Sequence, residues 1–132
     1  MPNQKLPRKK ASQKSYLMES EDETIRLEIK TDPEALKKQA MWCGIKPRMR
    51  VLDVACGPGK TTAILHDMVQ PGGSIVGIDF SEERIKYASE QYGNTSGIEF
   101  KVHDFRDSLE VLGQFDFIWV RFVLEYYRKE AL

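Results

Sequence analysis

Short apolar runs alternate with amphipathic segments along this chain, and the alternation predicts strands and helices in turn. Residues 51–55 read V-L-D-V-A, an apolar run broken only by Asp53, as expected for a buried strand of a parallel sheet. Residues 61–69 then carry apolar side chains at helical spacing, namely Ile64, Leu65, Met68 and Val69. The turn Gly57-Pro58-Gly59 separates the two segments. Strand, tight turn and helix are typical of the first crossover of an open α/β sheet.

The same alternation continues toward the C-terminus. Residues 74–79 predict a second strand, and Ser81 caps a helix with apolar residues at Ile85, Ala88 and Tyr92. Residues 98–102 alternate between apolar and polar, as an edge strand does, and residues 115–120 predict a fourth strand. A further helix is expected from residue 124. For these four strands we expect the order 3-2-1-4.

Two helices are expected before the first strand. The segment Ser20-Glu21-Asp22-Glu23 is a capping box that opens a helix running to about residue 30. A second helix restarts at Pro33, with Leu36, Ala40 and Met41 expected on one face. Gly44 stands where a C-terminal cap is expected.

Three nucleotide-binding patterns compete for the glycine turn. A phosphate-binding P-loop is excluded, because its first glycine would fall at Val54. A dinucleotide fingerprint G-x-G-x-x-G is weakened, because Thr62 stands at its third glycine position. The segment D-x-x-C-G-P-G resembles the first motif of class I S-adenosylmethionine-dependent methyltransferases. The resemblance continues through I-V-G-I-D-F (75–80), H-D-F (103–105) and F-D-F-I-W-V-R (115–121), in the order of that family.

The resemblance implies a Rossmann-like parallel sheet with flanking helices, preceded by an N-terminal helical lid. We expect a flexible basic arm at 1–15, the lid at 16–46 and an S-adenosylmethionine-binding core at 47–132. Tyr16 and Arg26 of the lid could then reach the pocket, where Arg26 would meet the methionine carboxylate; an arginine exposed on its helix is the favoured alternative for Arg26. Since the family has seven strands and four are found here, we expect the core to be incomplete after the fourth strand. The N-terminal portion of a longer protein is the favoured explanation, and a pared-down variant of the fold is the alternative.

The resemblance also implies roles for individual residues. Ala55, Gly57 and Gly59 would bring the loop backbone close to the cofactor. Asp79 ends the second strand, where a carboxylate can accept hydrogen bonds from both ribose hydroxyls, although an acid at a helix N-terminus is the structural alternative. Asp53 would lie near the amino-acid end of the cofactor and order the loop; the alternative is a carboxylate that only caps backbone amides.

The adenine end would be built from later segments. Phe80 would lie against the ring, with core packing as an equal alternative. Asp104 would accept from the adenine amino group beside the Phe105 backbone, and Arg121 would lie at the pocket mouth. No catalytic residue is expected to be recognisable, because much of methyl transfer is alignment of an already activated cofactor. No metal site is expected, since neither Cys43 nor Cys56 belongs to a Cys/His cluster with zinc spacing.

Composition limits the classes of substrate and partner that we expect. Twenty Lys and Arg balance twenty Asp and Glu, and the basic excess is confined to residues 1–15, so a nucleic-acid substrate is disfavoured. Neither a membrane span nor a signal peptide is apparent, and a cytoplasmic location is expected. A small-molecule methyl acceptor is favoured. The apolar edge of an incomplete sheet also suggests a dimer.

Methyl transfer with S-adenosylmethionine is therefore the expected function. One alternative is a module that binds this cofactor without catalysis. Another is half of an NAD-dependent oxidoreductase, which Thr62 and Asp53 disfavour.

Overall fold

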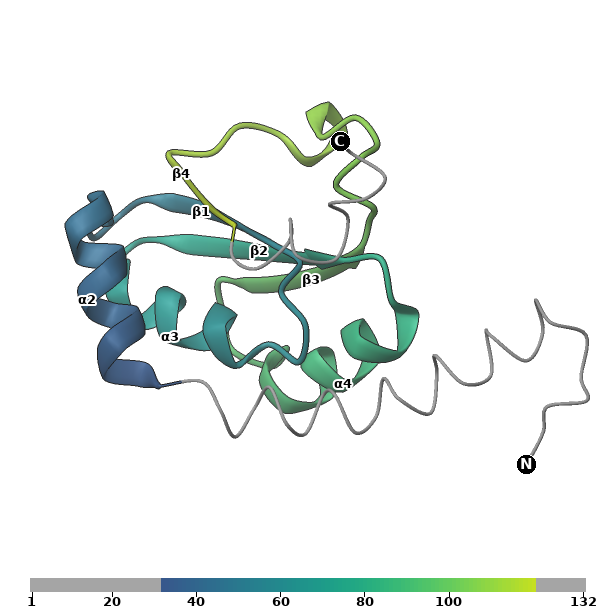
Figure 1. Cartoon of the computed structure of the whole chain (residues 1–132), viewed down its shortest axis with the longest axis horizontal. Helices are drawn as coiled ribbons and strands as arrows, with labels where there is room; N and C mark the ends of the chain where they lie inside the picture. Colours follow the sequence, from purple (N-terminus) through teal and green to yellow (C-terminus); the bar gives the residue numbers. More distant parts are fainter. Residues whose placement is uncertain (1–31, 121–132) are drawn as a thin grey trace, which may run out of the picture.

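A parallel four-stranded sheet forms the centre of the part that the computed structural model describes, residues 32–120. The strand order is β3-β2-β1-β4, as predicted (Figure 1). The strands are β1 (Arg50–Val54), β2 (Ser74–Asp79), β3 (Ile98–Val102) and β4 (Phe117–Val120). Because all four run the same way, their carboxyl ends meet at one edge of the sheet, where ligands of this architecture bind.

Three helices pack on one face of the sheet: α2 (Pro33–Cys43), α3 (Lys60–Met68) and α4 (Glu82–Tyr92). Figure 1 shows α3 and α4 below the strands and α2 beside them. Local sequence sets their ends. The side chains of Asp32 and Ser81 accept hydrogen bonds from the first turns of α2 and α4, and Gly44 ends α2 in the left-handed region.

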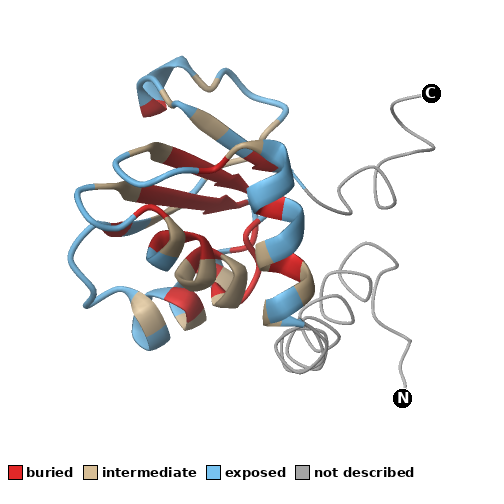
Figure 2. Ribbon diagram, turned by 90° about the vertical axis from the view of Figure 1, so that its left-hand side faces the viewer, coloured by how far each residue is buried: buried red, intermediate tan, exposed pale blue. Residues whose placement is uncertain are grey.

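The two faces of the sheet have separate hydrophobic cores, because successive residues of a strand point to opposite sides. Toward the helices, Val51 and Ile75 pack with Leu36, Leu65 and Trp119. Toward the other face, Leu52, Val54, Val76 and Ile78 pack with Leu112 of the short 3-10 helix η1 (Glu110–Leu112). Figure 2 shows the central strands buried along almost their whole length. Helix α2, part of the predicted lid, thus belongs to the same core as the sheet.

Two predictions about these elements were wrong. Met41 does not share the buried face of α2 but is 67% exposed, because it lies about 100° around the helix from Ala40. The fourth strand begins at Phe117 rather than Phe115. Phe115 and Asp116 instead hold the start of β1: the Phe115 ring lies under the Arg50 guanidinium, and the Asp116 carboxylate accepts from the Arg50 amide.

Several predictions lie outside the described residues. They concern the basic arm at 1–15, the capping box at 20–23 with its helix, Tyr16, Arg26, Arg121 and the helix from residue 124.

Among the described strands, β4 forms one edge of the sheet and presents apolar side chains there. Ile118 and Val120 are more than half exposed, and Trp42 of α2 is 88% exposed. A shallow groove runs between α2 and β4 and is lined by these side chains together with Phe117 and Trp119. Within residues 32–120, no helix has both the length and the apolar character needed to cross a membrane.

Arg50 joins β1 to the segment that leads into β4. Its guanidinium donates to the carbonyl oxygens of Gln114 and Leu112, each at 2.9 Å, and lies 4.6 Å from the centre of the Phe115 ring. The planar fork of arginine suits this arrangement, since it donates in two directions while stacking on an aromatic face.

We expect Arg50→Lys to lower the free energy of unfolding by about 1–2 kcal/mol, because an ammonium cannot keep both carbonyl hydrogen bonds and the stacking contact. Urea unfolding followed by circular dichroism measures the change. Arg48→Lys is the matched control, since the exposed Arg48 side chain makes no hydrogen bond to residues 32–120. Equal stability of both variants would contradict this role for Arg50.

Candidate functional site

The loop between β1 and α3 reverses the chain in only five residues, 55–59. Three of them have left-handed backbone conformations: Ala55 at φ 60°, Gly57 at φ 58° and Gly59 at φ 95°. Glycine adopts such angles without cost, whereas alanine is strained there. Ala55 is nevertheless exposed, while Gly57 and Gly59 are buried. The loop is therefore tightly specified, and one of its residues is held in an unfavourable conformation.

Gly59 is required for packing as well as for backbone conformation. A β-carbon at this position would lie 2.9 Å from both the Ala88 β-carbon and the Tyr92 ring, and 3.2 Å from Phe100. Helix α3 can therefore start directly against α4 and β3 only if residue 59 has no side chain. This packing requirement is separate from the predicted approach of Gly59 to the cofactor, which stays a prediction.

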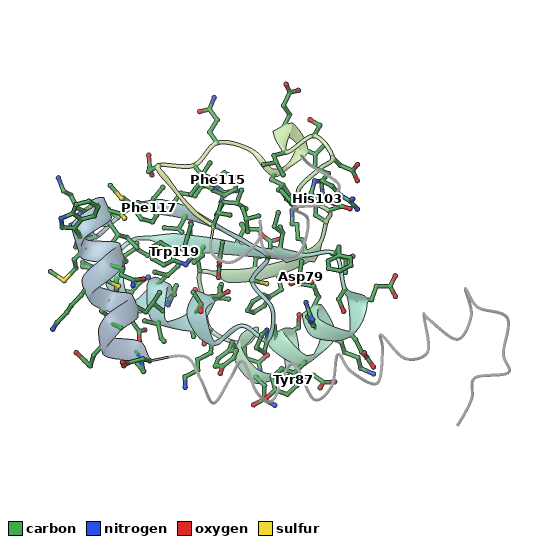
Figure 3. All side chains as sticks on the ribbon, viewed as in Figure 1. Asp79, Tyr87, His103, Phe115, Phe117 and Trp119 are labelled. Atoms are coloured by element: carbon green, nitrogen blue, oxygen red, sulfur yellow. The ribbon has the colours of Figure 1, made fainter. Side chains whose placement is uncertain are left out.

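Asp79 fastens the loop to the end of β2. One oxygen of its carboxylate accepts from the Gly57 amide at 3.0 Å, and the other accepts from the Ser81 amide at 3.0 Å. The Arg84 guanidinium lies 3.9 Å away. Burial raises the pKa of this carboxyl, and the backbone hydrogen bonds and Arg84 oppose the shift. Figure 3 shows Asp79 at the opposite end of the sheet from Phe117.

Asp53 is the second buried carboxyl under the loop, with only 2% of its surface exposed. It accepts a hydrogen bond of 2.6 Å from the Thr62 hydroxyl, in the first turn of α3. Burial raises its pKa to about 7, the Thr62 hydrogen bond lowers it, and the charge of Asp79 raises it. Asp53 therefore titrates near neutral pH, unlike an ordinary aspartate.

The residues expected at the adenine end follow β2 and β3. Phe80 is 45% exposed directly after β2, so it is not a core residue. Asp104 forms a two-pronged ion pair with Arg106, its oxygens lying 2.7 and 3.0 Å from guanidinium nitrogens, and this pairing lowers the pKa of Asp104. Phe105 packs against the core on the face opposite the helices. A hydrogen bond from the His103 amide to the Asp79 carbonyl joins the two segments.

The structure thus brings Asp53, Gly57, Gly59 and Asp79 together around one loop, with Ala55 on its surface. Phe80 follows Asp79 in the chain, and Asp104 and Phe105 follow β3, while Arg121 lies outside the described residues. Sequence reasoning missed the contact of Thr62 with Asp53. The sequence did contain a hint of this contact, because Thr62 places a hydroxyl group in the first turn of the helix that follows the loop.

Comparison with known proteins identifies a family that the chain matches and solved structures with a similar fold. Residues 51–132 match the model of a family described as a methyltransferase domain. The demethylmenaquinone methyltransferase of Staphylococcus carnosus (strain TM300) is 34% identical over 80 residues, which make up 61% of this chain and 33% of that protein. The chain thus spans about a third of the length of this curated relative.

Solved structures share the architecture at lower identity. A protein-L-isoaspartate O-methyltransferase superposes with a TM-score of 0.60 and 24% identity, over 68% of this chain and 29% of that one. The cyclase SpnF superposes with a TM-score of 0.56 and 21% identity, over 67% of this chain and 33% of that one. Since one of these neighbours is named as a cyclase, the fold alone does not fix the reaction.

We expect Ala55→Gly to raise the free energy of unfolding by about 1 kcal/mol, because it removes left-handed strain that exceeds the added entropy of the unfolded chain. Ala63→Gly, within helix α3, is the matched control and should lower stability by about 1 kcal/mol. Urea unfolding of both variants measures these opposite changes in the free energy of unfolding. A loss of stability in Ala55→Gly would contradict the strain at this position.

We expect Asp53→Asn to remove a pH dependence of stability. The folded-state pKa of about 7 lies above the ordinary 3.8, so proton binding stabilises the wild type fully below about pH 4, and this contribution is lost as the pH rises through 7. Asparagine still accepts from Thr62 but carries no charge. At pH 8 the variant should be more stable by about 2–4 kcal/mol, with little difference at pH 4. If the free energies of unfolding of wild type and Asp53→Asn changed in parallel from pH 4 to 8, the raised pKa of Asp53 would be contradicted.

Proposed function

This chain belongs to the methyltransferase-domain family, whose model covers residues 51–132, and from that membership we propose that it binds S-adenosylmethionine around the β1–α3 loop and transfers the methyl group to a small molecule. S-adenosylmethionine is the cofactor of this family. The observation that carries the proposal is the buried Asp79 carboxylate that accepts from the Gly57 amide, at the carboxyl edge of a parallel sheet.

Asp79 is suited to a ribose by its remaining hydrogen-bonding capacity. A carboxylate offers about four acceptor positions, and the amides of Gly57 and Ser81 use two of them. The Phe80 amide also acts on this carboxylate, and we propose that ribose hydroxyls use the acceptor capacity that remains. We therefore assign the ribose to Asp79 and the close approach of the loop backbone to Ala55, Gly57 and Gly59.

Asp53 is suited to the cationic end of the cofactor. S-adenosylmethionine carries an ammonium and a sulfonium. Asp53 has no cationic partner within residues 32–120, and such a buried carboxylate favours a positive ligand. A dinucleotide would instead bring a pyrophosphate toward this acid, which is unfavourable. The position of Asp53 under the loop thus favours S-adenosylmethionine over NAD.

The adenine end of the proposed site lies along the segments after β2 and β3. The half-exposed Phe80 ring offers an apolar surface for the base. Asp104 would accept from the adenine amino group, for which its pairing with Arg106 keeps it ionised. Phe105 supplies the neighbouring backbone, and we assign Arg121 to the pocket mouth.

When bound, S-adenosylmethionine would supply an already activated methyl group for transfer to an acceptor atom. The task of the protein residues is alignment. The loop, Asp79 and Asp53 fix the two ends of the cofactor, so that the methyl group faces one direction. Such alignment can account for about 7–11 kcal/mol of a reaction barrier.

For the acceptor we propose a small molecule rather than a nucleic acid, since positive and negative residues balance over the chain. The name of the staphylococcal relative makes demethylmenaquinone one compound to include in an acceptor screen. We further propose residues 16–46 as a lid, the basic arm at 1–15 as a separate segment and residues 47–132 as the cofactor-binding core. The dimer through the sheet edge and the cytoplasmic location stay predictions.

A second candidate is a module that binds S-adenosylmethionine without transferring its methyl group. It is favoured because every residue assigned above is assigned to the cofactor, and none is assigned to the activation of an acceptor. Methyl transfer by the 132-residue chain to any compound of the screen would exclude this candidate.

We expect the wild-type chain to bind S-adenosylhomocysteine in calorimetric titration, and Asp79→Asn to bind at least tenfold more weakly, because the loop amide and the ribose both lose a charged acceptor. Asp67→Asn is the matched control, since the Asp67 side chain on α3 is 82% exposed. NAD is titrated in parallel. Preference for NAD, or equal affinity in Asp79→Asn and the control, would contradict the proposed site.

A further inference from the structure

Asp53 and Asp79 lie under the same loop but differ in their hydrogen-bond donors and in the charges near them. Asp79 accepts from two backbone amides and has the Arg84 guanidinium 3.9 Å away. Asp53 receives one hydrogen bond from residues 32–120, that of the Thr62 hydroxyl. Thr62 itself is completely buried. A buried carboxylate with a single neutral donor is under-compensated when ionised.

Among residues 32–120, no cation contributes to the pKa shift of Asp53. Its partners in the sheet register are Gly77 of β2 and Trp119 of β4, neither of which titrates. The charge of the Asp79 carboxyl raises the pKa of Asp53. Burial, and after it the charge of Asp53, raises the pKa of the neighbouring Cys56 thiol well above its ordinary value. On α3, His66 lies one turn beyond Thr62 and pairs with Gln70.

We propose that Thr62 is a positioning residue that holds Asp53 ready to ionise, so that uptake of a cationic ligand at the β1–α3 loop expels the Asp53 proton to solvent. This inference rests on the proposed function, because it takes the ligand to be S-adenosylmethionine. The step is balanced: the O–H bond of the protonated Asp53 breaks, the proton passes to buffer, and the ligand's positive charge replaces it.

The direction of the pH effect follows from this exchange. A protonated Asp53 must lose its proton before it attracts the cation, so affinity rises with pH up to the range in which Asp53 ionises, near neutrality. Without the Thr62 hydroxyl, ionisation loses its only hydrogen bond from residues 32–120. The midpoint of the affinity profile should then move upward by about one pH unit or more.

Two measurements on the full chain test the inference. Carboxyl-carbon NMR follows the titration of Asp53 without ligand in wild type, Thr62→Ser and Thr62→Val. Calorimetry with S-adenosylmethionine from pH 5.5 to 8.5, in buffers of different ionisation enthalpy, reports affinity and proton release. Thr61→Val is the matched control, because the neighbouring Thr61 is partly exposed and donates no hydrogen bond to Asp53.

The inference is supported if binding releases a proton and if Thr62→Val raises the midpoints of both the Asp53 titration and the affinity profile. Thr62→Ser and Thr61→Val should keep the wild-type midpoints. Binding without proton release, or the same midpoints in a folded Thr62→Val, would overturn the inference while leaving the proposed function intact. If the NMR midpoint rises in Thr62→Val but wild type binds no S-adenosylmethionine at any pH, the proposed function fails together with the role of the proton exchange. Asp53→Asn should lack the rise in affinity that accompanies ionisation of Asp53 in the wild type.

Discussion

The hydrogen bond from the Gly57 amide to the Asp79 carboxylate is the contact on which the site depends. It joins the loop after β1 to the end of β2, over a sequence separation of 22 residues. A second bond, from the Cys56 amide to the Ile78 carbonyl, extends the pairing of the two strands into the loop. Because the loop is fixed at both residues, its left-handed conformations persist even at Ala55, where they are unfavourable.

Burial of two acids beneath one loop is costly unless each has a compensating partner. For Asp79 the compensation is internal, in the form of two amides and a nearby arginine. For Asp53 it is mostly absent, and a ligand with positive charge would provide it. The buried Asp53 carboxylate therefore lowers the stability of the free protein, as is common for residues of binding sites, where stability and function oppose each other.

The packed core and the candidate site lie in different parts of the sheet. Toward the helices, Leu36, Leu65 and Val51 form a closely packed core, and Gly59 lets α3 approach α4. At the carboxyl edge of the strands, the buried carboxyls of Asp53 and Asp79 lie under the β1–α3 loop. The opposite end, near Phe117 and Phe115, is held by Arg50 and its carbonyl partners. The site is therefore supported by packing from all four strands but formed by few residues.

The strands, their order, the helix caps and the glycine loop could be predicted from the sequence, because periodicity, turn residues and caps act over a few neighbouring positions. The family resemblance also followed from local motifs and is confirmed by the family match. The tertiary structure decided the rest. Helix phase put Met41 in solvent, and a cation–aromatic contact with Arg50 removed Phe115 from β4. The partners of Asp53 and Asp79 also depend on contacts between distant segments, which no local pattern encodes, and those contacts decide which carboxyl is left to a ligand.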